Sequence, residues 1–272
     1  MDQCTSRSRS SVSPSWLFGL IAASGLACAF DALADDNGPV PDERTTTSDQ
    51  TRWGIGLGAA ILERPYKDYD RETKVVPILY VDNRWLSVNG GRFDFKMNRS
   101  ETLNLRLRAR YALDGYDADD SPFLAGMNDR DDSAWVGAAV VWKPAFAEFS
   151  AEYLTDAMDN SEGSRFRVEV ERRFAAGRFG FTPRLAADWL DAKYVGYYYG
   201  VRPDEVLPLR AAYAGEATTN LEAGLRIDYS PGARHTFFLD ASAVKLGSAI
   251  KDSPLTGKSD QVRVTAGYLF HF

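Results

Sequence analysis

Apolar and polar side chains alternate with a period of two along most of the chain after residue 52. The clearest run is 103–111, where leucines, an alanine and a tyrosine alternate with Asn104, Arg106, Arg108 and Arg110. Similar alternation recurs at 149–153, 166–170, 221–229 and 237–243. Because successive side chains of a strand point to opposite faces, this period predicts β-strands, and a helical period fits none of these runs.

The breaks between these runs alternate in length along the chain. Short breaks lie near 82–84, 98–100, 143–145, 175–178 and 230–233, and mostly longer ones at 63–73, 112–132, 157–163, 191–218 and 247–259. Transmembrane barrels have short periplasmic turns and long extracellular loops, whereas a soluble sandwich has no reason to sort its loops by end. The pattern therefore predicts an all-β protein, a transmembrane antiparallel up-and-down β-barrel.

The same sorting predicts the number of strands. If 112–132 is an outer loop, 86–97 has to be a hairpin turning at Asn89-Gly90-Gly91, a favoured tight-turn sequence. Twelve strands result, near 53–62, 74–82, 84–89, 91–97, 101–112, 133–143, 146–156, 164–174, 179–190, 219–229, 234–246 and 260–272. The third and fourth are shorter than the roughly 9 to 11 residues that spanning requires. Either the barrel is low on that side or the count is ten.

The last predicted strand ends in outward-facing aromatic residues. Its outward set is Val262, Val264, Ala266, Tyr268, Phe270 and Phe272, and the alternate set is mostly polar or small. A strand that ends on the terminal carboxylate behind outward aromatics resembles the closing strand and assembly signal of a bacterial outer-membrane barrel. Tyr268, Phe270 and Phe272 are the candidate signal, and the barrel-assembly machinery is an expected partner.

The first residues have the composition of an export signal. Arg7 and Arg9 precede an uncharged run over 16–30, and Ala32-Leu33-Ala34, with small residues at its two ends, follows it. This arrangement predicts a signal peptide over 1–34. A membrane anchor is the alternative, but the run is shorter than the roughly 20 residues that a spanning helix needs.

Cleavage at this position removes both cysteines, Cys4 and Cys28, so no disulfide or thiolate chemistry is expected in the mature chain. A lipoprotein at Cys28 is a further alternative, which Gly25 disfavours because leucine is usual there. Residues 35–52 are polar and are interpreted as a flexible periplasmic lead, and 53–272 as the outer-membrane barrel.

Composition narrows the class of partner. The net charge is −6 and the mean hydropathy is −0.32. After the leader there is no apolar run of the roughly 18 residues that a spanning helix needs, so membrane contact has to come from alternating strands. The acidic balance argues against a nucleic-acid partner, which favours a basic surface.

The polar side of each strand faces the lumen in a barrel of this kind. Charges of both signs fall there, and pairing across a narrow or plugged interior is favoured over an open channel. The candidate lumen-lining residues are Arg106, Arg108, Arg110, Arg167, Glu169, Arg184, Asp188, Glu222, Arg226, Asp240 and Arg263, together with Glu148, Glu152 and Asp228.

Signals of catalysis are weak. The motifs HExxH, GxSxG and GxxxxGK[ST] do not occur, and the alternate glycines of 54–58 are interpreted as packing residues of a strand. His235 and His271 fall at periplasmic strand ends, whereas a base acting on outer-leaflet lipid belongs at the outer rim. Aspartates over 112–132 could bind divalent ions, but a solvated acidic loop is the commoner case. No catalytic, cofactor or metal site is predicted.

Several segments resemble the MipA/OmpV family of Gram-negative outer-membrane proteins. They are loop 120–129 with Ser121, Pro122 and Gly126, segment 197–201 with Tyr199 and Gly200, segment 245–255 with Ser253 and Pro254, the glycine-alternating first strand, Val75-Val76-Pro77, and the close Gly267-Tyr268-Leu269-Phe270-His271-Phe272. Ala125 and Asn128 depart from the family pattern. The resemblance runs from about Trp53 to the last residue.

The resemblance implies an outer-membrane barrel without known catalysis. The family's named member is a scaffold that brings a lytic transglycosylase together with a murein synthase, and other members are surface immunogens or adhesion and osmotic-response proteins. We therefore expect a non-enzymatic scaffold in contact with outer-membrane lipid, lipopolysaccharide and these murein enzymes. The alternatives are a narrow porin for small solutes, or a surface adhesin that uses loops 112–132 and 191–218.

Overall fold

Period-two patterning builds the strands of a closed sheet. The computed structural model describes residues 51–69, 71–98 and 100–272, so the expected signal peptide and nearly all of the expected lead lie outside the described residues. The strands are β1 (Arg52–Leu62), β2 (Glu72–Asp82), β3 (Leu86–Asn89), β4 (Arg92–Lys96), β5 (Leu103–Ala112), β6 (Ser133–Trp142), β7 (Glu148–Asp156), β8 (Ser164–Glu171), β9 (Phe174–Ala176), β10 (Phe179–Leu190), β11 (Thr218–Gly232), β12 (His235–Lys245) and β13 (Asp260–His271).

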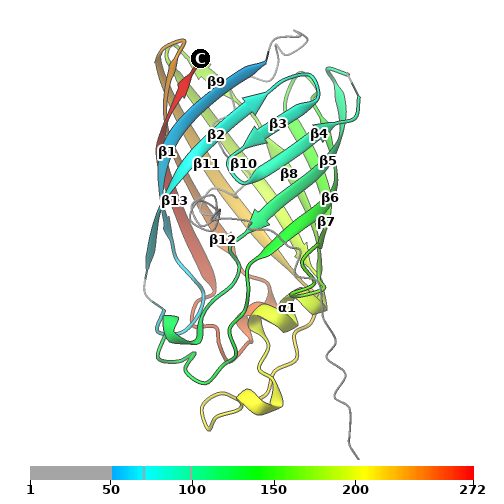
Figure 1. Ribbon diagram of the computed structural model, residues 1–272, viewed down its shortest axis with the longest axis vertical. Coiled ribbons are helices and arrows are strands. Elements are labelled where there is room, and N and C mark those ends of the chain that lie inside the picture. Colours follow the sequence, from blue (N-terminus) through cyan, green and yellow to red (C-terminus); the bar gives the residue numbers. More distant parts are fainter. Residues whose placement is uncertain (1–50, 70, 99) are drawn as a thin grey trace, which may run out of the picture.

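These strands form one antiparallel barrel, in which neighbours in sequence pair in order and β13 returns to β1 (Figure 1). β8 and β9 both pair with β10 at different heights, so together they make one interrupted strand. The barrel wall therefore consists of twelve strands, with β8 and β9 counted as one. The prediction of twelve is confirmed, and the alternative of ten is wrong.

The short third and fourth strands make the barrel wall low on one side. β3 pairs with only three residues of β2, Tyr80–Asp82. The hairpin turns at Gly90, whose φ of 58° lies in the left-handed region that favours glycine. The predicted turn sequence thus ends the hairpin well before the long-loop end of β2.

Burial is inverted relative to a soluble protein. On β5 the side chain of Leu107 is 49% exposed, while that of the neighbouring Arg108 is 6% exposed. The same alternation of exposed apolar and buried polar residues recurs on β8 and β10. An apolar outer band around a polar interior is the arrangement that lipid on the outside requires.

Glycines let β1 and β13 approach closely where these two strands pair and close the barrel. A Cβ on Gly56 would overlap the carbonyl oxygen of Tyr268, since the two strands pair there at close range. At the chain end the rings of Trp53 and Phe272 stack at 3.8 Å between centroids. The alternate glycines of β1 are therefore packing residues, as the sequence predicts.

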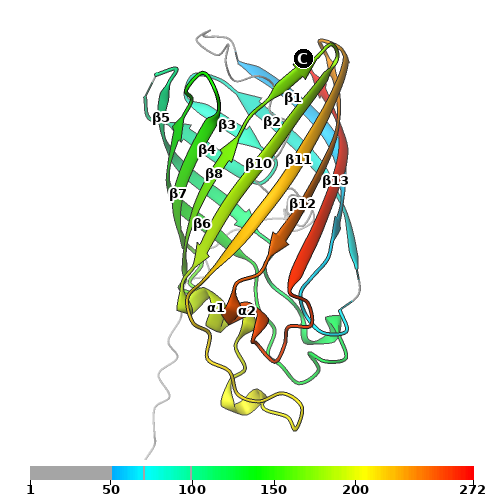
Figure 2. The same ribbon diagram turned by 180° about the vertical axis from the view of Figure 1, so that it is seen from behind.

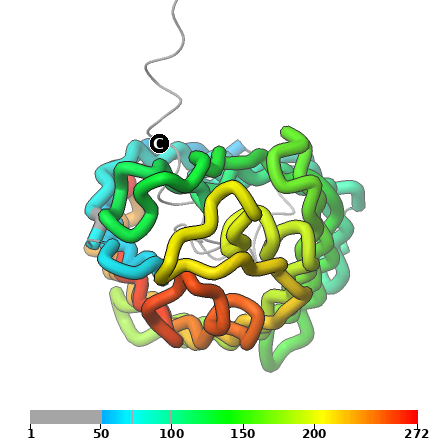
Figure 3. Tube along the Cα trace, turned by 90° about the horizontal axis from the view of Figure 1, so that it is seen from below, coloured from blue at the N-terminus to red at the C-terminus, as the bar shows by residue number. Residues whose placement is uncertain are grey.

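The two helices and the long loops gather at one end of the barrel. α1 (Ala192–Tyr199) and α2 (Ser248–Lys251) lie beyond the strand ends opposite to the C-terminus (Figure 2). Seen from that end, the loops run across the mouth (Figure 3). Short turns and chain ends mark the periplasmic side in barrels of this class, and long loops mark the extracellular side. No helix in the described part of the chain has the length and apolarity to cross a membrane.

Candidate functional site

Buried ion pairs link β4, β5 and β7 along the inner wall of the barrel. Asp94 accepts hydrogen bonds from Nε and Nη2 of Arg108, both at 2.7 Å, and from Nη1 of Arg106 at 3.2 Å. Nη1 of Arg108 also donates to Oε2 of Glu152, whose other oxygen lies 3.5 Å from Nη2 of Arg110. The β4–β5 register makes this possible because it sets Asp94 directly opposite Arg108.

A second network joins β8, β10, β11 and β12. Nε of Arg184 donates to Glu222 at 3.0 Å, and its two terminal nitrogens donate to the two oxygens of Asp240 at 2.9 Å. Nη2 of Arg167 binds the other oxygen of Glu222 at 3.0 Å. A Cβ on Gly224 would overlap the Arg184 guanidinium, so this glycine leaves the room that lets the arginine reach across β11.

Further pairs lie toward the two ends of the lumen. At the short-turn end Asp228 accepts from Nε of Arg226 at 2.9 Å and from Nη1 of Arg173 at 2.7 Å. At the long-loop end Nη2 of Arg165 donates to Asp188 at 2.6 Å. Ion pairs therefore line the inner wall at several heights, and most of these charged side chains are almost fully buried.

The residues predicted from alternation to line the lumen all lie at inward-facing positions. Most take part in these networks; Glu169 accepts from Arg167 at 2.7 Å, and Arg263 is half-buried at the long-loop end of β13. The inward-facing set comprises Arg106, Arg108, Arg110, Arg167, Glu169, Arg184, Asp188, Glu222, Arg226, Asp240 and Arg263. Sequence reasoning missed Asp94, although it alternates with the exposed Phe93 and Phe95 and could have been found from that signal.

Both histidines lie at the short-turn end. Nδ1 of His235 is 2.7 Å from the hydroxyl of Tyr268, and Nε2 of His271 is 3.3 Å from Oγ1 of Thr236. Each histidine thus contacts the hydroxyl group of a neighbouring strand at the short-turn rim. Within the described ranges no three histidine, cysteine or carboxylate side chains gather as a metal ion requires.

The long loops pack on one another and on the strand ends to form a cap over the mouth. Tyr198 and Ile250, one from each helix, are fully buried together with Trp135 of β6. A second apolar cluster joins four different loops through Tyr66, Tyr116, Leu124, Met127, Val201 and Leu255. Apolar burial of this extent is a property of folded structure, not of solvated loops.

A buried ion pair links the two longest loops within this cap. Nη2 of Arg130 donates to both oxygens of Glu205 at 2.8 and 3.0 Å, and each side chain is 1% exposed. Burial alone would raise the pKa of Glu205, but hydrogen bonds from the Arg202 amide and from Arg130 outweigh it and hold the pKa below its ordinary value. Arg210 extends the link by donating to the Phe123 carbonyl at 2.7 Å.

The family-like loop residues make contacts of the cap. Oγ of Ser253 donates to the Tyr199 carbonyl at 2.6 Å, and Oγ of Ser121 donates to the Lys67 carbonyl at 2.6 Å. Gly126 has a φ of 80°, which favours glycine. Gly200 packs against a backbone carbonyl of α1, Pro254 is half-buried, and Pro122 is exposed.

The sequence of the barrel and its cap matches a known protein family. The sequence pattern of the family described as MltA-interacting protein MipA matches residues 55–272. The chain belongs to the MipA family. This membership, with the closed barrel and its apolar outer band, makes it an outer-membrane protein, as the sequence predicts.

Relatives of this MipA-family chain are similar over most of their length. The MltA-interacting protein of Escherichia coli K12 is 24% identical over 241 residues, which is 81% of this chain and 90% of that protein. YiaT of the same strain is 26% identical over 221 residues, with shares of 80% and 90%. The outer membrane protein OmpV of Vibrio cholerae is 22% identical over 185 residues, with shares of 68% and 72%. An outer membrane channel of Pseudomonas putida F1 has a TM-score of 0.45 at 8% identity, covering 86% of this chain and 100% of that one.

Proposed function

We propose that this MipA-family chain is a non-enzymatic outer-membrane scaffold that holds murein-remodelling enzymes at its periplasmic end. The observation that carries the proposal is the interior, where charges such as Asp94 and Arg184 are 1% and 3% exposed and are paired with one another. A lumen filled in this way, under a packed cap, suits a rigid anchor better than a path for solutes. The name of the MltA-interacting relative supplies the expected partner, a lytic transglycosylase.

The short-turn end has a surface suited to such a partner. Exposed arginines occur in three of its turns, namely Arg84, Arg172 with Arg178, and Arg234. The exposed apolar rings of Trp85 and Phe146 lie in turns of the same end. Exposed aspartates such as Asp117, Asp119 and Asp129 lie at the opposite, long-loop end. A basic rim with aromatic residues favours an acidic partner surface, because complementary charge steers encounter and fixes orientation.

Crosslinking in intact envelopes, followed by affinity capture of the barrel, tests the scaffold. We expect the native chain to recover a lytic transglycosylase and a murein synthase. The double variant Arg172→Glu/Arg178→Glu should recover less of both, because it reverses charge on one turn. The matched control Lys193→Glu/Lys251→Glu changes two exposed lysines at the long-loop end and should recover as much as the native chain. Recovery of neither enzyme, with other envelope partners captured normally, contradicts the proposal.

Planar-bilayer recording tests the closed interior separately. We expect no stable open current from the native chain. A steady current that changes when Arg106, Arg108 or Arg110 is neutralised would assign the lumen to a channel instead. Recognition by the barrel-assembly machinery through the outward-facing Tyr268, Phe270 and Phe272, and contact with lipopolysaccharide, stay predictions.

A further inference from the structure

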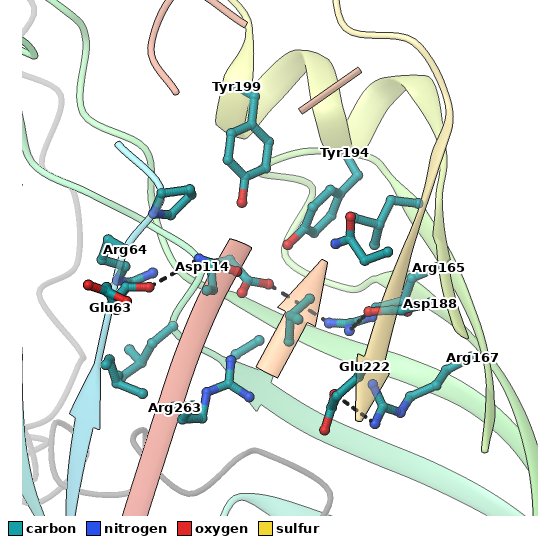
Figure 4. Close-up of a pocket in the computed structure, with 18 of the residues that line it drawn as sticks. Glu63, Arg64, Asp114, Arg165, Arg167, Asp188, Tyr194, Tyr199, Glu222 and Arg263 are labelled. Carbon is teal, nitrogen blue, oxygen red and sulfur yellow. Dashed lines mark hydrogen bonds and ion pairs between the residues drawn. The ribbon is translucent and has the colours of Figure 1, made fainter. Parts of the chain in front are cut away.

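A cavity of about 150 Å³ lies between the lumen networks and the cap. Its floor includes Arg167 and Glu222 of the second network, and Tyr194 and Tyr199 of α1 form its roof. Figure 4 shows both tyrosine hydroxyls pointing toward the space between them and the ion pairs. The volume matches about five water molecules at the ~30 Å³ that each occupies in liquid water. One solute of the size of a small amino acid would also fit.

The charges that line the cavity are unequal. Five arginines face four carboxylates, and two of these carboxylates are shared with cations outside the cavity. Glu63 accepts from Lys258 at 3.0 Å, and Glu222 accepts from Arg184 at 3.0 Å. Arg167 and Arg110 are in turn shared with Glu169 and Glu152, which lie outside the lining. Charges of both signs therefore line the cavity, and the planar fork of an arginine there matches a bound carboxylate.

Among the buried lining atoms that have no hydrogen-bond partner within the described residues, three lie on side chains at the long-loop end. They are Nε of Arg165, Oδ1 of Asp188 and Oδ2 of Asp114. Arg165 is 9% exposed, and its Nη1 stands 3.9 Å from Oδ2 of Asp114, too far for a hydrogen bond. Buried polar atoms are nearly always hydrogen-bonded in native proteins. An unpartnered donor beside two unpartnered acceptors favours bound species that both accept and donate hydrogen bonds, which water molecules and a small zwitterion each do.

We propose that this cavity binds a small zwitterion of the α-amino acid class. Its carboxylate accepts from Nε of Arg165 and from the hydroxyl of Tyr199, and its ammonium donates to the free oxygens of Asp188 and Asp114. Burial raises the pKa of Tyr199, so the hydroxyl stays protonated and is available as a donor. A simple anion satisfies the arginine but gives the two carboxylate oxygens no proton, which is why the zwitterion fits better. The site is independent of the scaffolding role.

Calorimetric titration of the purified, folded barrel in detergent tests the site. The probes are glycine, L-alanine and D-alanine, with acetate and methylammonium as the two halves of the zwitterion. We expect saturable binding of at least one amino acid, one per chain, and much weaker binding of each half. Asp188→Asn should weaken binding about tenfold or more, as expected for loss of a charge-assisted hydrogen bond. The matched control Asp228→Asn alters an Arg–Asp pair of similar length, 2.7 Å, at the other end of the lumen and should bind normally.

Tyr199→Phe provides a second variant that keeps every charge and the packing of the ring. It should weaken binding about 2- to 10-fold, the value of one neutral hydrogen bond. Heat-modifiable gel migration shows whether each variant is folded. Three results overturn the proposal: no saturable heat with any amino acid at tens of millimolar, acetate binding as tightly as the amino acids, or unchanged affinity in the folded variants of both residues.

Discussion

Neutralising Asp94 tests whether the ion pairs around it in the lumen are shielded from water. This carboxylate is 1% exposed and accepts three hydrogen bonds from Arg106 and Arg108. Asp94→Asn keeps the shape but removes the negative charge between two buried guanidinium groups. Breaking a buried pair from one side costs about 3–5 kcal/mol, because the remaining charge is left uncompensated. If water filled the lumen, screening would reduce the cost to roughly 0–1 kcal/mol.

Urea unfolding of the barrel in phospholipid vesicles measures this cost, with tryptophan emission and heat-modifiable migration as two readouts. Arg108→Gln, alone and combined with Asp94→Asn, completes a cycle whose coupling we expect within the range of about 0.5–3 kcal/mol for residues in contact. Lys193→Gln, which removes an exposed pair with Glu162, should leave the midpoint unchanged. A loss below about 1 kcal/mol for Asp94→Asn would refute the reasoning, because that is the value of a hydrated pair.

Three further predictions concern the pairing of β1 with β13 and the cap. Gly56→Val should prevent refolding to the heat-modifiable form, because its Cβ would overlap the Tyr268 carbonyl, whereas Gly232→Ala, with open space at its Cβ, should refold normally. The pKa of Glu205 is lowered, so its contribution to cap stability is present above its unfolded pKa of about 4.3 and is lost as pH falls through the folded value. An acid-active protease should therefore cut the cap faster at low pH, and a protease active at neutral pH should already cut the Glu205→Gln variant faster than the native chain. Burial and neighbouring aspartates raise the pKa of Asp117, so its loop loses stability as pH rises, and Asp117→Asn should slow loop cleavage at neutral pH.

The barrel could be predicted from the sequence because its rule is local. In each strand the alternation of apolar and polar residues indicates which side chains face outward and which face inward. The alternation of short and long loops then indicates how the strands follow one another around the barrel. The low wall at β3 and β4 followed from their length and from the turn at Gly90. Side-chain partners could not be predicted, because they depend on register across the closed sheet. Arg184 meets Asp240 only because Gly224, one strand away in the β10–β11 register, leaves space for the guanidinium.

The cap was beyond the reach of sequence reasoning for a different reason. Loops 112–132 and 191–218 carry no periodic pattern, and the buried ion pair between them, Arg130 with Glu205, joins residues 75 positions apart. Long outer loops are expected to be solvated, which suits the exposed aspartates of the first loop. The tyrosines of 194–199 were the available signal, since so many aromatic side chains in one loop have to be buried somewhere.

The two walls of the lumen differ, and this difference strengthens the ion pairs. At mid-height on the side of β1, β2 and β13 an apolar cluster faces inward, with Ala60, Val76, Ile78 and Leu269 at most 2% exposed. On the other side the inward residues are the paired charges. Arg226 connects the two walls, because its guanidinium lies 4.3 Å from the ring centroid of Phe238. An apolar wall excludes water, and charges beside it interact in a lower dielectric than in a hydrated pore. A passing ion would lose its hydration beside that wall and would have to break pairs on the other, so we expect the interior to stiffen the barrel and not to conduct.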